Sequence, residues 1–216
     1  MPLCVILAAL PSPALAQEDA LSDRQLTLGG AVAPAILPSG AVAFYGYLGF
    51  PELGFGFRQG FGLIEFEARG RFHYPQVGFG VEALAKVRVY DGDDFSVAPY
   101  VGLGAVANSG ARYLDTANFP YLGIRPLVGA AASYALAETL RAIALLEVPF
   151  DVGLVPAGAG GRLNPLVGGG LELYLGEDFT GMVMGRVGLD LLFPPASSPL
   201  PRFGFEVRLG LGYRLF

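Results

Sequence analysis

Ionisable side chains recur at every second residue along several stretches of this chain, with apolar side chains between them. In Leu63–Phe72, Glu65, Glu67, Arg69 and Arg71 alternate with isoleucine, phenylalanine and alanine. Successive side chains of a β-strand point to opposite faces, so this spacing gives one charged face and one apolar face. The charged residues that we expect to line one common lumen are Glu65, Glu67, Arg69, Arg71, Glu82, Lys86, Arg88, Arg125, Arg141, Glu147, Glu172, Arg186, Asp190, Glu206 and Arg208.

Glu52, Arg58 and Arg214 share this charged face, and the full set then holds eight acidic and ten basic residues. A charge inside a lipid-crossing segment is tolerated only where it faces the interior and finds a partner. The near balance therefore favours mutual ion pairs that fill a narrow lumen. The alternative is a polar lining along which a small solute passes.

The one histidine, His73, precedes Tyr74 and Pro75 at the expected outer end of a strand. Nucleophilic catalysis needs a hydroxyl, a base and an orienting acid close together. No serine neighbours His73 in sequence, although Ser109 or Ser198 in expected loops could approach it. The simpler interpretation is a histidine at the membrane interface or in a loop, with no catalytic residues in the chain.

Other short motifs do not predict a cofactor or a metal. The glycine repeats are followed neither by a helix start nor by Gly-Lys-Ser/Thr, so they do not form a phosphate-binding loop. The carboxylates of Asp91–Asp94 lack the spacing of an EF-hand, and a solvated hairpin turn explains them better than calcium. The only cysteine, Cys4, falls in the expected signal peptide, so the mature chain has no thiol chemistry.

The alternation extends over most of the chain and is clearest in the last fifteen residues, Arg202–Phe216. There, Phe203, Phe205 and Val207 begin an unbroken apolar series, and the other parity holds glycine and charge. We expect an all-β, antiparallel up-and-down transmembrane barrel of ten strands, with eight or twelve as alternatives. The ten expected strands are Ala41–Phe50, Glu52–Gln59, Leu63–Phe72, Gln76–Tyr90, Phe95–Ala107, Leu122–Leu136, Thr139–Phe150, Arg162–Leu175, Phe179–Phe193 and Arg202–Phe216.

The connections between these strands sort into two groups. Tight turns around residues 59–62, 91–94, 137–138 and 176–178 fall at one end of the expected barrel. Longer connections at 108–119, 151–161 and 194–201 fall at the other. Short periplasmic turns and longer external loops are typical of outer-membrane barrels.

Composition agrees with strands in lipid. The 216 residues are 53% hydrophobic and only 15% charged, and no uncharged run after residue 16 is long enough for a spanning helix. Residues 1–16 end in Ala-Leu-Ala and predict a cleaved signal peptide. Residues 17–40 are an expected periplasmic lead-in, lying under or inside the barrel, and residues 41–216 are the barrel. The formal charge of −5 argues against a nucleic-acid partner.

Aromatic residues near the expected strand ends predict girdles at the membrane interfaces. They are Phe44, Tyr45, Tyr47, Tyr74, Tyr90, Phe95, Phe119, Tyr121, Tyr174, Phe179, Phe193 and Tyr213.

Signal peptide, alternating strands, unequal loops and an aromatic C-terminus together resemble the small outer-membrane β-barrel proteins of Gram-negative bacteria, the OmpA- and OmpW-like class. The resemblance covers residues 41–216 and is one of pattern. It implies a non-enzymatic, porin-like protein of the outer membrane, structural or forming a narrow pore. Its implied partners are outer-membrane lipid, the barrel-assembly machinery and small solutes.

Two other functions remain open from the sequence. Some small outer-membrane barrels are enzymes, lipid A-modifying or protease-like, and His73 would serve such a site. A secreted, soluble lipocalin-like carrier would instead place the apolar parity inside and the charged parity in water.

Overall fold

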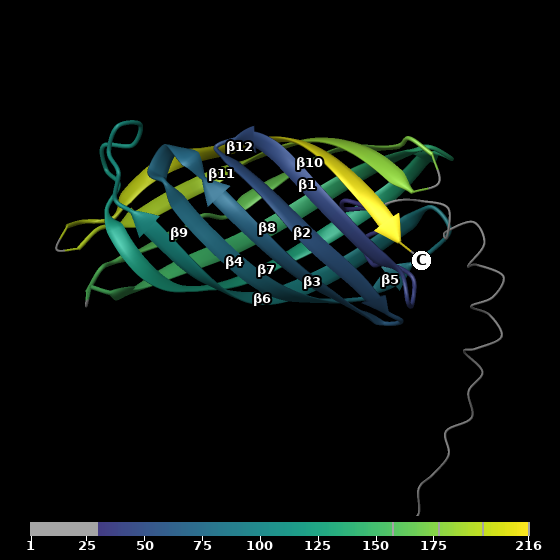
Figure 1. The fold of residues 1–216 in the computed structure, drawn as a ribbon, viewed down its shortest axis with the longest axis horizontal. Helices are drawn as coiled ribbons and strands as arrows, with labels where there is room; N and C mark the ends of the chain where they lie inside the picture. The colour runs from purple at the N-terminus through teal and green to yellow at the C-terminus, as the bar shows by residue number, and fades with distance from the viewer. Residues whose placement is uncertain (1–29, 157, 177, 196, 216) are drawn as a thin grey trace, which may run out of the picture.

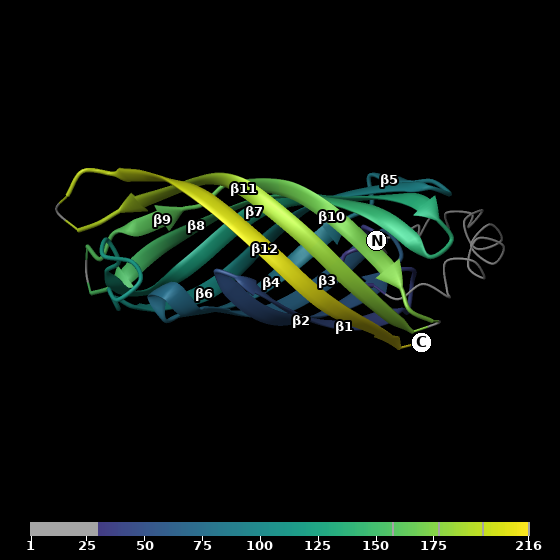
Figure 2. The ribbon, with the colours of Figure 1, turned by 90° about the horizontal axis from the view of Figure 1, so that it is seen from above.

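The computed structural model describes residues 30–156, 158–176, 178–195 and 197–215. Within them the chain is an antiparallel sheet closed on itself, with steeply tilted strands (Figures 1 and 2). No helix in this part of the chain is long and apolar enough to cross a membrane. The expected signal peptide, residues 17–29 of the lead-in, and Phe216 lie outside the described residues. The strands are β1 (Val42–Phe50), β2 (Glu52–Phe61), β3 (Ile64–His73), β4 (Gly78–Val87), β5 (Tyr90–Asp91), β6 (Phe95–Ser109), β7 (Pro120–Ala137), β8 (Leu140–Val155), β9 (Gly161–Leu163), β10 (Leu166–Tyr174), β11 (Phe179–Phe193) and β12 (Leu200–Leu215).

Ten of the described strands form the barrel wall, which confirms the expected number. The wall closes where β1 pairs with β12, from Val42 opposite Leu215 to Phe50 opposite Val207. The remaining two strands are short: β5 pairs with β6, and β9 bridges β8 and β11. The tight turns that the sequence predicts at one end lie where β1 begins and β12 ends, and the longer loops lie at the opposite end (Figure 1). The short β1–β2 and β3–β4 connections lie at that opposite end as well.

Prolines account for two departures from the expected strand limits. Pro165 has no N–H to donate, and it separates β9 from β10 where one continuous strand was expected. Pro75 lies in a short 3-10 turn, η1 (Tyr74–Gln76), so β4 begins at Gly78 rather than at Gln76. β8 in turn is longer than expected, because it continues to Val155 through part of the expected 151–161 loop.

Apolar side chains point outward and charged ones inward, as burial along β12 shows. Phe205, Leu209 and Leu211 are exposed, whereas Glu206 and Arg208 between them are buried. A soluble carrier would require the reverse arrangement, so that hypothesis is wrong. The outer surface is the apolar band that a transmembrane barrel presents to lipid.

Five of the expected girdle aromatics lie inside instead. Tyr45 and Tyr47 occupy the buried parity of β1, and their hydroxyl groups donate hydrogen bonds to Glu67 and to Glu52 (2.7 Å). Phe119, Tyr121 and Tyr174 are buried inside as well, and Phe119 packs against Tyr121. A tyrosine carries a polar hydroxyl as well as a ring, so it can fill a charged interior while satisfying a carboxylate.

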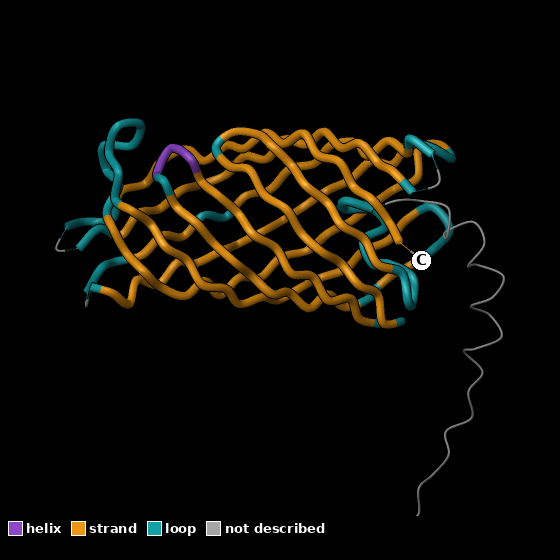
Figure 3. The backbone as a smooth tube through the Cα atoms, in the orientation of Figure 1, coloured by secondary structure: helices purple, strands orange, loops and turns teal. Residues whose placement is uncertain are grey.

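Residues 30–38, part of the expected lead-in, lie inside the barrel at the end that carries the tight turns (Figure 3). We call this segment the plug. Its apolar residues contact a patch of apolar side chains on the inner wall, where Ala31 and Ala33 pack near Ile143 and Met182. Ala35 and Ile36 pack against a second group that includes Leu84, Tyr100 and Leu127.

Candidate functional site

The interior of the barrel holds three groups of ion pairs, and each group has as many cations as carboxylates among the described residues. We name them by their height in the barrel. The central network contains Arg69, Arg71, Arg125, Arg186 and Arg208 with Glu52, Glu82, Glu147, Asp151 and Glu206. The inner network contains Arg58 and Lys86 with Glu65 and Glu67, and the outer network contains Arg162 and Arg202 with Asp115 and Asp190.

The central network crosses the lumen. Glu147 on β8 accepts a hydrogen bond from Arg69 Nη2 (2.7 Å), although β4, β6 and β7 separate these two strands in the sheet. Arg208 on β12 likewise reaches Glu52 on β2 at 2.7 Å, past β1. Charged hydrogen bonds between strands that are not neighbours therefore fill the middle of the barrel.

The plug is held by polar groups as well as by apolar contacts. The carboxylate of Glu172, on β10, accepts hydrogen bonds from the backbone N–H groups of Ala31, Val32 and Ala33 at 2.8–2.9 Å. Glu172 is fully buried, so these three N–H groups compensate its lost hydration. Arg58 of the inner network adds a hydrogen bond from Nη2 to the carbonyl oxygen of Pro34 (2.8 Å).

Two wall glycines leave room for the plug. A Cβ on Gly60 would lie 2.2 Å from the carbonyl oxygen of Pro38, and one on Gly212 would lie 2.9 Å from the nitrogen of Ala31. The wall is thus shaped to this segment at two separate points, and the plug occupies the inner end of the lumen.

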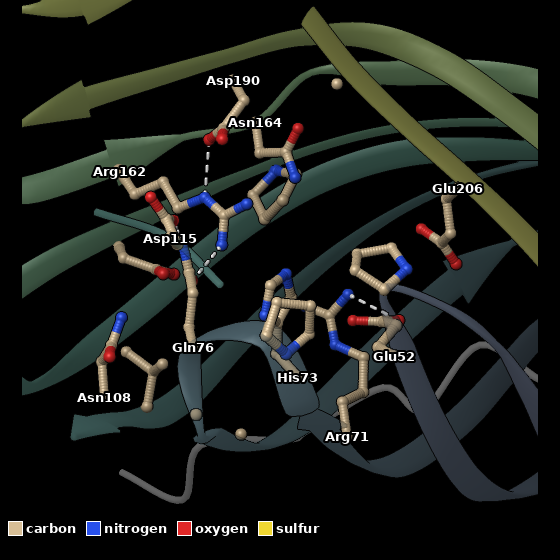
Figure 4. Close-up of a pocket in the computed structure, with 18 of the residues that line it drawn as sticks. Glu52, Arg71, His73, Gln76, Asn108, Asp115, Arg162, Asn164, Asp190 and Glu206 are labelled. Atoms are coloured by element: carbon tan, nitrogen blue, oxygen red, sulfur yellow. Dashed lines mark hydrogen bonds and ion pairs between the residues drawn. The ribbon is translucent and has the colours of Figure 1, made fainter. Parts of the chain in front are cut away.

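The outer end of the lumen is open and forms a cavity of about 280 Å³, which we call the vestibule. Figure 4 shows its polar lining, with Arg162 between Asp190 and Gln76. Arg162 Nε donates to Asp190 (2.6 Å), and Asp190 also accepts from Arg202 (2.5 Å). A second, small cavity of about 30 Å³ lies between the central network and the plug, and it shares no lining residue with the vestibule.

Asp115 connects the loop of residues 110–119 to the vestibule. Its carboxylate accepts hydrogen bonds from Gln76 Nε2 (2.6 Å) and Arg202 Nη1 (2.7 Å). Burial alone would raise the pKa of Asp115, but the hydrogen bonds from Gln76 and Arg202 outweigh it, and the pKa lies below its ordinary value. Asp115 therefore stays ionised near neutral pH and fixes the loop over the vestibule.

His73 lies in the vestibule wall at the end of β3 (Figure 4). Its Nδ1 has no hydrogen-bond partner among the described residues. Ser109, expected as a possible nucleophile, donates to the carbonyl oxygen of Gln76 (3.0 Å), and Ser198 lies exposed in the loop before β12. In the described chain no three His, Cys, Asp or Glu side chains are grouped so that they could hold a metal ion.

One of the expected lumen residues, Arg88, does not lie in the lumen. Arg88 lies beyond the end of β4, partly exposed, and its Nε is 3.4 Å from Asp91 in the same turn. It departs from the expected lumen position because the strand ends at Val87, one residue before it. Of the remaining fourteen, Arg125 is half-buried at the lumen wall. The other thirteen are buried inside the barrel; they are Glu65, Glu67, Arg69, Arg71, Glu82, Lys86, Arg141, Glu147, Glu172, Arg186, Asp190, Glu206 and Arg208.

Sequence reasoning missed four members of the networks. Asp151 and Asp115 were assigned to loops, yet both lie under or inside the outer rim. Arg162 and Arg202 begin expected strands and were not included among the lumen residues. The parity of Arg202 with Glu206 and Arg208 is the signal that could have identified it.

No family model matches the chain, and no curated protein matches it. Several solved structures are similar in fold. A KdgM porin in complex with disordered oligogalacturonate is 10% identical, with a TM-score of 0.45 over 82% of this chain and 99% of that one. A bacterial polysaccharide outer membrane secretin is 12% identical, with a TM-score of 0.47 over 76% and 56%. The outer-membrane expressed OmpT of Vibrio cholerae is 12% identical, with a TM-score of 0.39 over 82% and 62%.

The class of the protein follows from its own architecture. A closed antiparallel barrel with an apolar outer face, a charged interior and one end of tight turns is the outer-membrane β-barrel fold.

Proposed function

We propose that this chain is an integral, non-enzymatic β-barrel protein of a Gram-negative outer membrane, which passes small polar solutes through a narrow lumen that is closed at rest. The observation that carries the membrane assignment is the outward apolar face. Val101, Leu103 and Leu209, in mid-strand, are each more than half exposed. Water would make such a surface costly, and lipid removes that cost.

The orientation follows from the loops. The end with the tight turns and the plug would face the periplasm, and the vestibule would face outward. The partners in this proposal are outer-membrane lipid and the barrel-assembly machinery, with small solutes entering from the vestibule.

The pore function is supported by the polarity of the lumen, and its narrowness by what fills it. Solutes at the outer end meet the central network, and below it the plug occupies the lumen. A ten-stranded barrel is near the size that side chains can fill, far below the open porins of sixteen strands or more. We therefore expect a small conductance with rare openings.

An enzymatic function using His73 has no supporting observation. The arrangement it requires, a serine hydroxyl bonded to His73, is not formed by the described residues, because Ser109 is bonded elsewhere.

The test is the electrophoretic mobility of the membrane fraction with and without boiling, followed by planar-bilayer recording of the folded protein. We expect a fast band that slows on boiling, and small, infrequent current steps. Recovery in the soluble fraction without a mobility shift would contradict the membrane assignment. A folded barrel that never conducts, even when the plug is displaced, would leave a structural role in the membrane.

A further inference from the structure

The wall of the barrel is incomplete beside β12 at the outer end. β1 ends at Phe50, opposite Val207, whereas β12 continues outward to Leu200. In the described chain, residues 200–206 therefore pair with β11 on one side and have no strand on the other. The β1–β2 turn correspondingly ends well short of the outer loops (Figures 1 and 3).

We call this gap the side window. Its floor is the β1–β2 turn, residues 50–52, and its sides are residues 200–206 of β12 and residues 73–76. Its upper edge is the bridge in which Asp115 bonds to Gln76 (2.6 Å) on one side and to Arg202 (2.7 Å) on the other. The opening is therefore bounded by hydrogen-bonded groups rather than by frayed strand ends.

The vestibule extends into this window. Its lining includes Phe50, Phe203 and Phe205, which belong to the outward parity, together with the inward Glu52 and Glu206. An unpaired strand edge facing hydrocarbon would be costly, since each unsatisfied backbone group in lipid costs free energy. An opening at this height is tolerable only if polar groups or water from the vestibule reach the edge.

The outer side of the window carries a cluster of aromatic rings. Phe50 stacks on Phe205 with ring centroids 5.2 Å apart and contacts Tyr74 edge-on at 5.9 Å. Phe203 extends the cluster, 6.3 Å from Phe205, and is 72% exposed. Aromatic rings at the lipid interface offer an apolar surface to an alkyl chain.

The inner side of the window carries unused hydrogen-bond donors. Arg71 and Arg186 are both more than nine-tenths buried, and the Nε of each has no hydrogen-bond partner among the described residues. The carboxylates beside them are already paired: Glu52 with Arg208 at 2.7 Å, and Glu206 with Arg186 Nη2 at 2.6 Å. The two Nε–H groups can therefore donate to an additional hydrogen-bond acceptor, and a carboxylate head group matches two guanidinium N–H groups best.

We propose that the side window binds a single-chain amphiphile with a carboxylate head, which enters from the outer leaflet with its head in the vestibule and its alkyl chain along Phe50, Phe203 and Phe205. This inference rests on the proposed membrane function and adds a second route of access, lateral rather than axial. Free fatty acid and detergent carboxylates share this chemistry.

The first experiment uses the full-length barrel in phosphatidylcholine vesicles and a long-chain fatty acid that carries a diazirine on its chain. After irradiation, we expect cross-links to concentrate on the peptides that contain Phe50 and Phe203–Phe205. Unlabelled fatty acid and an alkyl carboxylate detergent of equal chain length should compete, and an alkylammonium of equal length should not. Cross-links spread evenly around the apolar belt, or equal competition by the cation, would overturn the proposal.

The second experiment uses matched aromatic variants. Phe205→Ala and, separately, Phe203→Ala should each weaken cross-linking at the window about three- to tenfold, the range expected for loss of one aromatic contact. Phe179→Ala is the control, because Phe179 forms an equivalent outward pair with Tyr213 (4.7 Å) at the opposite end of the barrel. Equal effects of all three variants would overturn the site.

Gel mobility with and without boiling separates the two levels of failure. Variants that keep the mobility shift are folded barrels, and an unlabelled window in them contradicts the side-window proposal alone. Loss of the shift in the wild-type chain, with recovery in the soluble fraction, would overturn the proposed membrane function and this inference with it.

Discussion

Arg69 and Glu147 join opposite walls of the barrel: Arg69 Nη2 on β3 lies 2.7 Å from Glu147 Oε2 on β8, and both side chains are buried. The same carboxyl group accepts a hydrogen bond from Tyr100 at 3.1 Å and lies 3.3 Å from Arg71. Glu147 therefore holds several cations and a hydroxyl at one point in the lumen, where Glu82 is the second carboxylate that pairs with Arg69 and Arg71.

Replacing this charge should destabilise the barrel strongly. Glu147→Gln would leave the guanidinium groups of Arg69 and Arg71 with less compensation, and breaking one partner of a buried pair costs about 3–5 kcal/mol. The measurement is the midpoint of urea unfolding in lipid vesicles. Glu138→Gln, in the exposed β7–β8 turn, is the control and should change stability by no more than about 0.5 kcal/mol. Equal midpoints for the two variants would contradict a supporting role for the central network.

The strand pattern was predictable because lipid and lumen impose opposite chemistry on alternate residues. β12 illustrates this: Phe205, Val207 and Leu209 face outward without exception, and the register with β1 follows the same parity. Strand ends were less predictable. Pro165 and Pro75 have no backbone N–H, and this interrupts pairing only where a partner strand lies at the same height in the barrel.

The pairing of the charges was not predictable from sequence. Which acid meets Arg69 depends on the strand order and the stagger of the closed sheet, and Glu147 lies 78 positions away. The plug was undetermined for a different reason. Its alanines and prolines show no periodicity. Its position inside the barrel is explained only by the wall residues that contact it, namely Glu172, Gly60 and Gly212.

The plug should become more mobile when the Glu172 carboxylate that binds its backbone is removed. Glu172→Gln replaces one acceptor oxygen by an amide N–H₂, which cannot accept from Ala31, Val32 or Ala33. In a Cys4→Ser background, Ala33→Cys should react slowly with a water-soluble maleimide, and about tenfold faster or more with Glu172→Gln added. Unchanged labelling would contradict anchoring by Glu172, and Asp93→Asn, in an exposed turn at the same end, is the control.

A small side chain at Gly60 should displace the plug by contact alone. The Cβ of Gly60→Ala would lie 2.2 Å from the carbonyl oxygen of Pro38 and 2.5 Å from that of Leu37, so the plug must move. We expect faster labelling of Leu37→Cys and more frequent current steps in bilayers. Gly46→Ala is the matched control, because the atom nearest to its new Cβ, the carbonyl oxygen of Gly54, would be 3.7 Å away, an ordinary contact. If both alanine variants behave alike, the fit between wall and plug is not what keeps the lumen closed.

The loop over the vestibule should open in acid. Because the pKa of Asp115 is lower in the folded protein than in the unfolded chain, its pairing stabilises the loop fully above the ordinary carboxyl pKa of about 4. That stabilisation is lost as the pH falls through the lower folded-state pKa, when the carboxyl group gains a proton and its bond to Arg202 weakens. Amide hydrogen exchange in residues 110–119, corrected for the intrinsic pH dependence, should therefore show protection that disappears at acid pH. Asp115→Asn should be poorly protected at neutral pH and insensitive to acid, whereas a variant with the wild-type profile would mean that other contacts, such as Asn118 with Ala111 (2.7 Å), hold the loop.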